Sequence, residues 1–224
     1  MIRVNVGCGP HPTPGWVNLD NSIAVLLARL PRHLTSFLAR VGMLNSGQTG
    51  AIRAARRNGV RRGSATKLPF QDNSVDVLYS SHMLEHLDRS EARKFVSECH
   101  RVLIPGGLLR LAIPDLGLYV EAYQRSADAD DFLERLRLAR PQVRGMRRIA
   151  EMLVGFRGHR WMYDRGSVEK LVKHASFDDI EILEPGRTLI AEPGALNLRE
   201  REGDSLYLEA RRPKERFEVG LPRS

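Results

Sequence analysis

The first twenty residues combine an apolar run, a glycine-rich break and a second apolar run that ends on an acid. Ile2 to Val6 is β-branched at alternate positions, which indicates a short buried strand. Gly7-Cys8-Gly9 follows directly, and glycines let the backbone approach a ligand closely. The second run, residues 16–19, ends on Asp20, whose carboxylate offers two acceptor oxygens. Glycines after one strand and an acid after the next are typical of nucleoside binding at a sheet edge.

The glycine signal taken by itself leaves an alternative open. It lacks the third glycine of the G-x-G-x-x-G fingerprint, and Pro10, Pro12 and Pro14 exclude a helix directly after it. Two edge strands joined by a proline-rich turn would explain the same residues. The choice between these interpretations therefore depends on motifs further along the chain.

Size and composition predict one globular domain in a reducing compartment. The chain has 224 residues, of which 42% are hydrophobic and 28% charged, as in ordinary globular proteins. Its two cysteines lie far apart, which argues against a disulfide framework and a zinc site, so we expect no metal ion. Since no apolar run reaches membrane-spanning length and no signal segment is evident, we expect a cytoplasmic protein without a membrane span.

The formal net charge of +8 has two explanations that the sequence leaves open. It indicates either an anionic partner or an arginine-rich proteome. The basic residues gather in two segments, which are predicted to be helical.

Residues 21–59 are predicted to form a helical insertion after the second strand. Apolar residues recur at helical spacing between residues 30 and 41, with Pro31 as a kink or break. Residues 48–58 predict a further short helix that carries arginines. We interpret those arginines as a solvated face, with ligand binding as the alternative. Residues 60–66 predict a third strand near the edge of the sheet.

A strand, a helix and a second strand follow in an order that implies a parallel sheet. Residues 75–79 predict a strand, residues 90–103 an amphipathic helix with a buried Cys99, and residues 108–113 another strand. His82 and Asp115 come just after the two strand ends, where ligands lie in open α/β sheets.

Residues 116–164 predict a basic helical cover over that edge of the sheet. Its arginines are opposed by Glu151 alone between residues 135 and 160, and His159 lies near its end. These arginines are expected either to meet an anionic acceptor or to form a solvated face. Residues 180–183 and 205–210 predict the last two strands, so the domain spans residues 1–212 and residues 213–224 form a loose tail.

In seven stretches the sequence resembles the class I S-adenosylmethionine-dependent methyltransferases. It is similar to the methyltransferase type 11 group, and within it to small predicted methyltransferases of glycan pathways. The stretches are Val4-Asn-Val-Gly-Cys-Gly9, Gly15-Trp-Val-Asn-Leu-Asp20, Leu68-Pro-Phe, Asp72-Asn-Ser-Val-Asp76, Ser81-His-Met-Leu-Glu-His-Leu87, Arg101-Val-Leu-Ile-Pro-Gly-Gly107 and Ser205-Leu-Tyr-Leu-Glu-Ala210. The first six are spread over most of residues 2–115, and none lies in the arginine-rich segment.

The resemblance implies an α/β, Rossmann-like three-layer sandwich. Its mostly parallel seven-stranded sheet would have a reversed last strand. S-adenosylmethionine would lie across the ends of the first, second and fourth strands, with S-adenosylhomocysteine as the product. The glycines would pass under its methionine part, Asp20 would hold the ribose, and the residues after Ser64 would border the adenine. The full set of implied cofactor-binding residues is Val6, Gly7, Cys8, Gly9, Asp20, Ala65, Thr66, Ser80, Ser81 and His82.

The expected reaction is O-methylation of a small-molecule or saccharide acceptor, with an anionic group met by the arginines. A hydroxyl acceptor gains from a general base, and His82, Asp115 and His159 are the candidate catalytic residues. The sequence lacks the Asn/Asp-Pro-Pro-Tyr motif that is typical of methylation of exocyclic amines on nucleic acid bases. It also lacks a cysteine placed for pyrimidine-carbon methylation, so a small-molecule or saccharide acceptor is favoured.

Two other classes of function stay open. The arginines favour an RNA-directed methyltransferase or RNA-binding protein on the same fold, although aromatic stacking residues are few. A dinucleotide-dependent oxidoreductase or a catalytically silent relative is the third possibility, which the short glycine motif disfavours.

Overall fold

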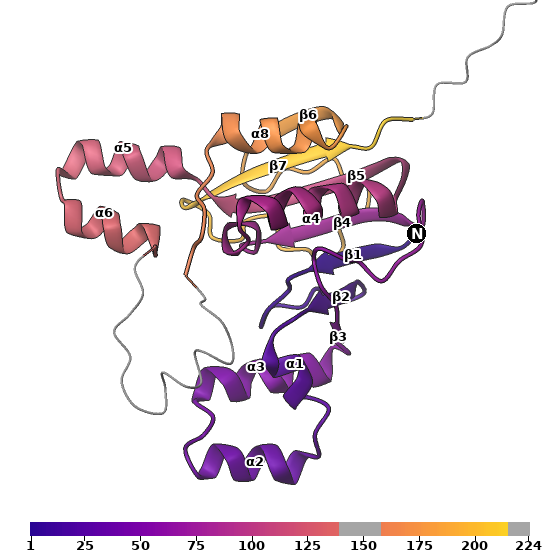
Figure 1. Cartoon of the computed structure of the whole chain (residues 1–224), viewed down its shortest axis with the longest axis vertical. Helices are drawn as coiled ribbons and strands as arrows, with labels where there is room; N and C mark the ends of the chain where they lie inside the picture. The colour runs from indigo at the N-terminus through magenta and orange to yellow at the C-terminus, as the bar shows by residue number, and fades with distance from the viewer. Residues whose placement is uncertain (139–157, 215–224) are drawn as a thin grey trace, which may run out of the picture.

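A seven-stranded sheet organises the chain (Figure 1). The computed structural model describes residues 1–138 and 158–214. The strand order is β3-β2-β1-β4-β5-β7-β6, and every neighbouring pair is parallel except those that β7 makes. The strands are β1 (Arg3–Val6), β2 (Val17–Asp20), β3 (Arg61–Arg62), β4 (Val75–Ser81), β5 (Leu103–Pro114), β6 (Asp178–Leu183) and β7 (Ser205–Arg211). The expected seven-stranded sheet with a reversed last strand is thus confirmed.

The helices occupy three places around this sheet (Figure 1). Helices α4 and α8 cover one face, α1–α3 lie beyond the β2–β3 edge, and α5 and α6 extend from the end of β5. The helical elements are α1 (Ile23–Leu27), α2 (Arg32–Arg40), α3 (Ser46–Arg57), η1 (Leu84–His86), α4 (Arg89–Val102), α5 (Leu116–Ser126), α6 (Ala129–Leu136) and α8 (Arg165–His174). None of the helices in the described ranges is long and apolar enough to cross a membrane.

The main core lies between the sheet and helices α4 and α8. The buried stripe of α4 includes Phe95, Val96 and Cys99, all without exposed surface, which places Cys99 in the core as expected. The helix begins one residue earlier than its sequence pattern indicates. Asp88 is the N-cap, because its carboxylate accepts from the backbone N–H groups of Ser90 and Glu91.

The opposite face of the sheet is covered by an extended segment, residues 184–204. Within the described residues this segment takes the place of the second helical layer that a three-layer sandwich would have. Leu196 and Ile190 from the segment pack with Trp16 and Tyr79 in a smaller core on this face. Hydrogen bonds from Arg110 and to Glu209 also attach the segment to the sheet.

The insertion at residues 21–59 is helical, as the spacing of its apolar residues predicts, but it is divided. The first helix, α1, ends at Leu27, and Pro31 serves as the N-cap of α2. The third strand is much shorter than predicted: only Arg61 and Arg62 pair with β2. Both side chains are exposed at the sheet edge. No buried side chain therefore favours a longer strand here.

Candidate functional site

The glycine loop after β1 is held against β2. The backbone N–H groups of Gly7 and Cys8 both donate to the carbonyl of Leu19, over 2.8 and 3.1 Å. Gly7 and Gly9 have φ angles of +72° and +51°, which glycine adopts without steric cost. A Cβ at Gly9 would meet no atom within 4 Å, so the loop borders open space there.

Asp20 ends β2 and fixes this loop. Its Oδ2 accepts from the Gly9 N–H over 2.9 Å and its Oδ1 accepts from the Ser22 N–H over 2.7 Å. The side chain is buried, yet each carboxylate oxygen keeps a second acceptor position. Asp20 can therefore support the loop and take ribose hydroxyls at the same time. The glycines and this acid fit a nucleoside cofactor.

The remaining residues of the expected cofactor site differ in what their side chains offer. The Ser80 hydroxyl donates to the carbonyl of Val6, inside the sheet, whereas the buried Ser81 hydroxyl has no partner in the described part of the chain. Thr66 and Ser64 share a hydrogen bond of 3.0 Å in the turn after β3. Burial raises the pKa of Cys8 to about 12, so its thiol is neutral and serves packing rather than nucleophilic chemistry.

Ala65 follows Ser64 in the same turn and packs partly against the main core. The cofactor contacts expected for Ala65, Thr66, Ser80 and Ser81 stay predictions.

His82 follows β4 in a left-handed conformation, with φ of +46°. Its Nε2 lies 2.8 Å from the Ser205 hydroxyl, which itself donates to the carbonyl of Glu200 and so accepts from the imidazole. Arg201, also left-handed at φ of +52°, donates to Nδ1 over 3.2 Å. Strained conformations of this kind gather at functional sites. Both ring nitrogens of His82 are engaged, so proton transfer would require one contact to open.

The other two expected catalytic residues lie in different surroundings. Asp115 is the N-cap of α5, where its carboxylate accepts from the Gly117 N–H, and burial raises its pKa. His159 is 4% exposed, and burial lowers its pKa although Glu85 opposes the change. A general-base role for His82, Asp115 or His159 stays a prediction.

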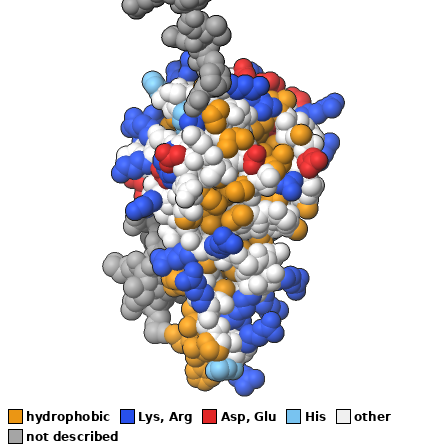
Figure 2. Space-filling model, turned by 90° about the vertical axis from the view of Figure 1, so that its right-hand side faces the viewer, with side chains coloured by type: hydrophobic (Ala, Val, Ile, Leu, Met, Phe, Trp, Pro, Cys, Tyr) orange, Lys and Arg blue, Asp and Glu red, His pale blue; other side chains and the backbone are white. Residues whose placement is uncertain are grey.

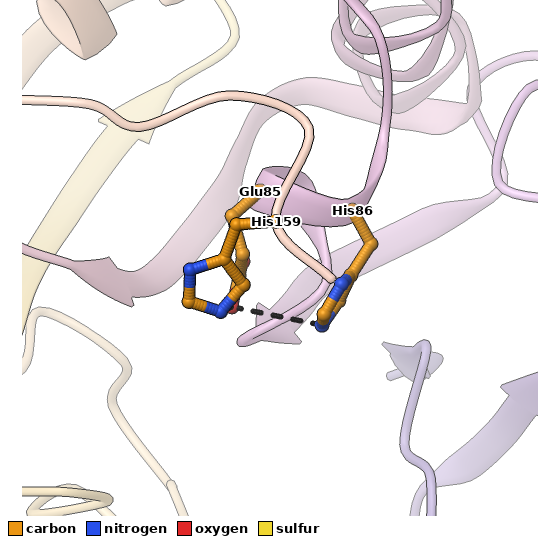
Figure 3. A group of neighbouring side chains, drawn as sticks. All are labelled: Glu85, His86 and His159. Carbon is orange, nitrogen blue, oxygen red and sulfur yellow. Dashed lines mark ion pairs between the residues drawn. The ribbon is translucent and has the colours of Figure 1, made fainter. Parts of the chain in front are cut away.

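Glu85 brings three histidines together, a cluster that the sequence does not predict; Figure 3 shows two of them, His86 and His159, beside Glu85. It lies in η1 with no exposed surface. Its Oε1 is 3.4 Å from Nδ1 of His82 and 4.0 Å from Nε2 of both His86 and His159. Neither carboxylate oxygen has a hydrogen-bond donor among the described residues. The spacing His82-x-x-Glu85-His86 was the available signal, since it puts three such residues on one short turn.

The electrostatics of this cluster favour a charged carboxylate. Burial acts to raise the pKa of Glu85, but the neighbouring His82, its own backbone N–H and His86 outweigh burial, so the pKa lies below its usual value. His86 Nδ1 lies 3.2 Å from the carbonyl of Gly158, which leaves Nε2 turned toward Glu85.

A pocket of about 780 Å³ adjoins the glycine loop; we call it the arginine pocket. Residues 10–14, one side of α3, Tyr79, Ala195, Asn197, Glu200 and Arg201 line it. Arg53 and Arg57, four residues apart on α3, and Arg201 contribute its positive charge. The arginines of α3 were interpreted as a solvated face, and only the fold shows that two of them line a pocket beside the glycine loop.

The second basic segment is only partly described. Arg135 pairs with Asp131 over 2.7 Å and Arg160 pairs with Glu91 over 3.1 Å, so both have acidic partners. The expected basic cover also includes residues outside the described ranges, namely Arg140, Arg144, Arg147, Arg148 and Arg157.

Known proteins were compared with the sequence and with the fold. A model of the methyltransferase domain family matches residues 23–111. A probable S-adenosylmethionine-dependent methyltransferase of Mycolicibacterium smegmatis is 43% identical over 56 residues, 25% of this chain and 21% of that protein. A malonyl-[acyl-carrier protein] O-methyltransferase of Coxiella burnetii is 42% identical over 59 residues, 26% of this chain and 20% of that protein. Over this region the chain is similar to S-adenosylmethionine-dependent methyltransferases, and residues 23–111 match the methyltransferase domain family.

The fold agrees with this family. A crystal structure of an S-adenosylmethionine-dependent methyltransferase from Methanosarcina mazei superposes with a TM-score of 0.52 at 18% identity, covering 95% of this chain and 92% of that one. At this identity the likeness concerns the fold alone. This chain matches only about a fifth of the length of each of the two curated relatives. S-adenosylmethionine is the cofactor of the family, and the geometry of the glycine loop and Asp20 suits it.

Proposed function

We propose that this methyltransferase binds S-adenosylmethionine at the ends of β1, β2 and β4 and methylates an oxygen of a small anionic acceptor. The observation that carries the proposal is the position of the arginine pocket. Its wall begins at Pro10, the residue after Gly9, so a molecule in the pocket would lie next to the cofactor loop. A saccharide that carries a phosphate or carboxylate fits the size and charge of this pocket.

Methyl transfer requires correct positioning of the acceptor and does not require a covalent intermediate with the protein. S-adenosylmethionine supplies a methyl group that is already activated as a sulfonium. The chain must hold the acceptor in line with that group and keep water away. Arg53, Arg57 and Arg201 can bind an anionic group by charge-assisted hydrogen bonds. The Coxiella burnetii relative is named as an O-methyltransferase, which supports oxygen as the methylated atom.

Calorimetry with S-adenosylhomocysteine tests the cofactor site. We expect Asp20→Ala to weaken binding by about 1.5–3 kcal/mol, the range for a hydrogen bond to a charged group. Asp72→Ala is the matched control, because Asp72 is an exposed acid that pairs with Arg101. Circular dichroism establishes that each variant is folded. Unchanged affinity in a folded Asp20 variant, or no binding by the wild type, would contradict the assignment.

A panel of phosphorylated and carboxylated sugars tests the acceptor. Arg53→Gln together with Arg57→Gln should raise the KM for the acceptor and leave S-adenosylhomocysteine affinity unchanged. Arg29→Gln is the control, because Arg29 is an exposed arginine of the same insertion outside the pocket. If no sugar is methylated and the protein binds RNA with steep salt dependence that the double variant loses, the RNA-directed alternative is favoured instead.

A further inference from the structure

Glu85, His86 and His159 direct one ligand atom each toward a common point (Figure 3). These three atoms lie within 4.8 Å of one another. Glu85 and His86 come from η1, whereas His159 comes from the segment that precedes α8. That segment is attached to η1 by its backbone, because the N–H groups of Arg160 and Trp161 both donate to the Glu85 carbonyl.

The carboxylate in this cluster lacks the partners that a buried charge requires. Glu85 is wholly buried, and no donor among the described residues reaches either of its oxygens. Buried charges in proteins are normally paired or bound to a metal. The nearest group is Nδ1 of His82, 3.4 Å from Oε1, and the Nε2 atoms of His86 and His159 are 4.0 Å away, outside hydrogen-bond range.

We propose that Glu85, His86 and His159 bind one divalent transition-metal ion through the carboxylate and the two Nε2 atoms. Ligand bonds of about 2.0–2.1 Å in a tetrahedral site place neighbouring ligand atoms about 3.3 Å apart. The two separations from the carboxylate oxygen are 4.0 Å and all three atoms lie within 4.8 Å of one another, so side-chain rotations must bring them closer by about 0.7 to 1.5 Å to close the site. Two imidazoles and a carboxylate suit zinc and its first-row neighbours.

The proposed site is of the open type. Three protein ligands leave at least one coordination position free, as in catalytic zinc sites. The His86 side chain is 37% exposed whereas Glu85 and His159 are buried, so the free position faces solvent on the His86 side. The Gly158 carbonyl lies 3.2 Å from His86 Nδ1, and this contact selects the tautomer whose Nε2 can ligate. A water or an oxygen of a ligand would complete the coordination.

Direct metal binding tests the site without any methyl-transfer assay, so its outcome is separate from that of the proposed function. The full chain, stripped with chelator, is titrated with Zn²⁺ against a chromophoric competitor and with Co²⁺ by visible absorption. We expect one ion per chain. His86→Ala should weaken Zn²⁺ by at least about 100-fold, since loss of an outer-shell partner alone costs 10–100-fold.

His174→Ala is the control, because His174 is an exposed histidine at the end of α8. Cobalt absorption that indicates nitrogen and oxygen ligands in the wild type and disappears in His159→Gln would support the site. The proposal is overturned if the stripped protein takes up no Zn²⁺ or Co²⁺, or if His86→Ala and His174→Ala bind them equally well. The cluster would then be a buried carboxylate packed among histidine side chains without a metal role.

A second, independent observation concerns α2, whose apolar face is turned away from the rest of the molecule. Leu34, Phe37 and Val41 recur at helical spacing and are 38%, 58% and 50% exposed. The face that packs toward α3 instead carries small residues, including the buried Thr35 and Ala39. An amphipathic helix in a globular protein normally has the opposite orientation.

Charge around this face has a single sign. Residues 21–59 contain six arginines and no aspartate or glutamate. In Figure 2 the end of the molecule formed by α1–α3 shows arginine and hydrophobic side chains together, without acidic ones. Arg32 and Arg40 on α2 and Arg29 before it are all exposed.

We infer that α2 docks on an anionic phospholipid surface, with its apolar residues in the headgroup boundary and its arginines at the phosphates. Charge and apolar area are both needed for such binding, and α2 presents the two side by side. A nucleic acid would use the arginines but leave the apolar row in water. The inferred contact is peripheral.

Vesicle co-sedimentation tests this surface. We expect binding to vesicles of phosphatidylglycerol and phosphatidylcholine, little binding to phosphatidylcholine alone, and a tenfold or greater loss with Phe37→Glu. Leu133→Glu is the matched control, since Leu133 is an equally exposed apolar residue on α6. No binding to anionic vesicles, equal binding to neutral ones, or an unaffected Phe37→Glu variant would overturn the inference. Dimerisation that Phe37→Glu abolishes, without vesicle binding, would assign the face to a second copy.

Discussion

At the scale of single residues, Gly7 shows how tightly the glycine loop after β1 is built. Its φ of +72° belongs to the left-handed region, and a Cβ added there would lie 2.4 Å from Cγ of Met83. Gly9 is also left-handed, but a Cβ on it would meet nothing within 4 Å. The two glycines are therefore required for different reasons: Gly9 for its backbone conformation, and Gly7 also for the close approach of Met83.

Gly7→Ala should destabilise the protein more than Gly9→Ala. Backbone strain costs about 1–3 kcal/mol at either position, and Gly7→Ala adds the overlap with Met83. Urea unfolding followed by circular dichroism measures both variants. In the Met83→Ala background the additional cost at Gly7 should largely disappear. Equal costs at the two glycines in the wild-type background would show that Met83 moves aside freely.

At the scale of elements, Glu98 joins α4 to the segment before β4. Its carboxylate accepts from the Leu68 N–H and from Nε and Nη2 of Arg101, which in turn pairs with Asp72. The Arg101 hydrogen bonds hold the pKa of Glu98 below its usual value. Because the folded-state pKa is lowered, the carboxylate stabilises the fold above about pH 4.5, and this contribution is lost as the pH falls through the folded-state pKa.

Glu98→Gln should lower the free energy of unfolding by roughly 1.5–3 kcal/mol at pH 7, the range for hydrogen bonds to a charged group. The difference from wild type should shrink on acidification below the usual glutamate pKa. Urea midpoints at a series of pH values measure this. Glu169→Gln, which breaks an exposed pair with Arg165, should cost about 0.5 kcal/mol or less. A Glu98 effect independent of pH would assign its role to packing.

At the scale of the whole molecule, a buried ion pair fastens the extended segment to the sheet. Arg110 on β5 and Glu209 on β7 face each other across the strands with no exposed surface, and their nearest atoms are 2.5 Å apart. Glu209 also accepts from the Thr188 hydroxyl and the Leu189 N–H. Arg110 donates to carbonyls of the same segment, so the pair anchors residues 184–204 from both of its members.

Glu209→Gln should destabilise the fold by about 3–5 kcal/mol, because it leaves a buried guanidinium without its counter-charge. The double variant Arg110→Met, Glu209→Leu should be more stable than this single variant, since it removes both charges. Its amide hydrogens in residues 185–198 should nevertheless exchange faster, because the anchors of the segment are gone. Thermal unfolding and hydrogen exchange measure the two effects. A double variant less stable than the single one would refute the argument from unpaired charge.

The sequence by itself determined the elements whose cause is local. Two patterns in the sequence show which side chains are buried: the alternating β-branched residues before Gly7 and the apolar stripe around Cys99. Both patterns are made by residues close together in the chain. The order of strand, helix and strand then predicted a parallel sheet, which the structure confirms, whereas the cofactor site at the glycines and Asp20 stays a prediction. The start of α4 was not determined in this way: the apolar pattern indicates residue 90, whereas the carboxylate of Asp88 caps a helix that begins at Arg89.

Only the tertiary structure decided which distant residues meet. The Arg110–Glu209 pair joins residues 99 positions apart, and His159 reaches Glu85 because a later segment crosses η1. Periodicity records burial but carries no information on the partner across a strand or a loop. Likewise Arg53 and Arg57 look like solvated surface in sequence, and they line a pocket because the insertion folds back beside the glycine loop. Those contacts depend on the path of the whole chain, which local patterns do not specify.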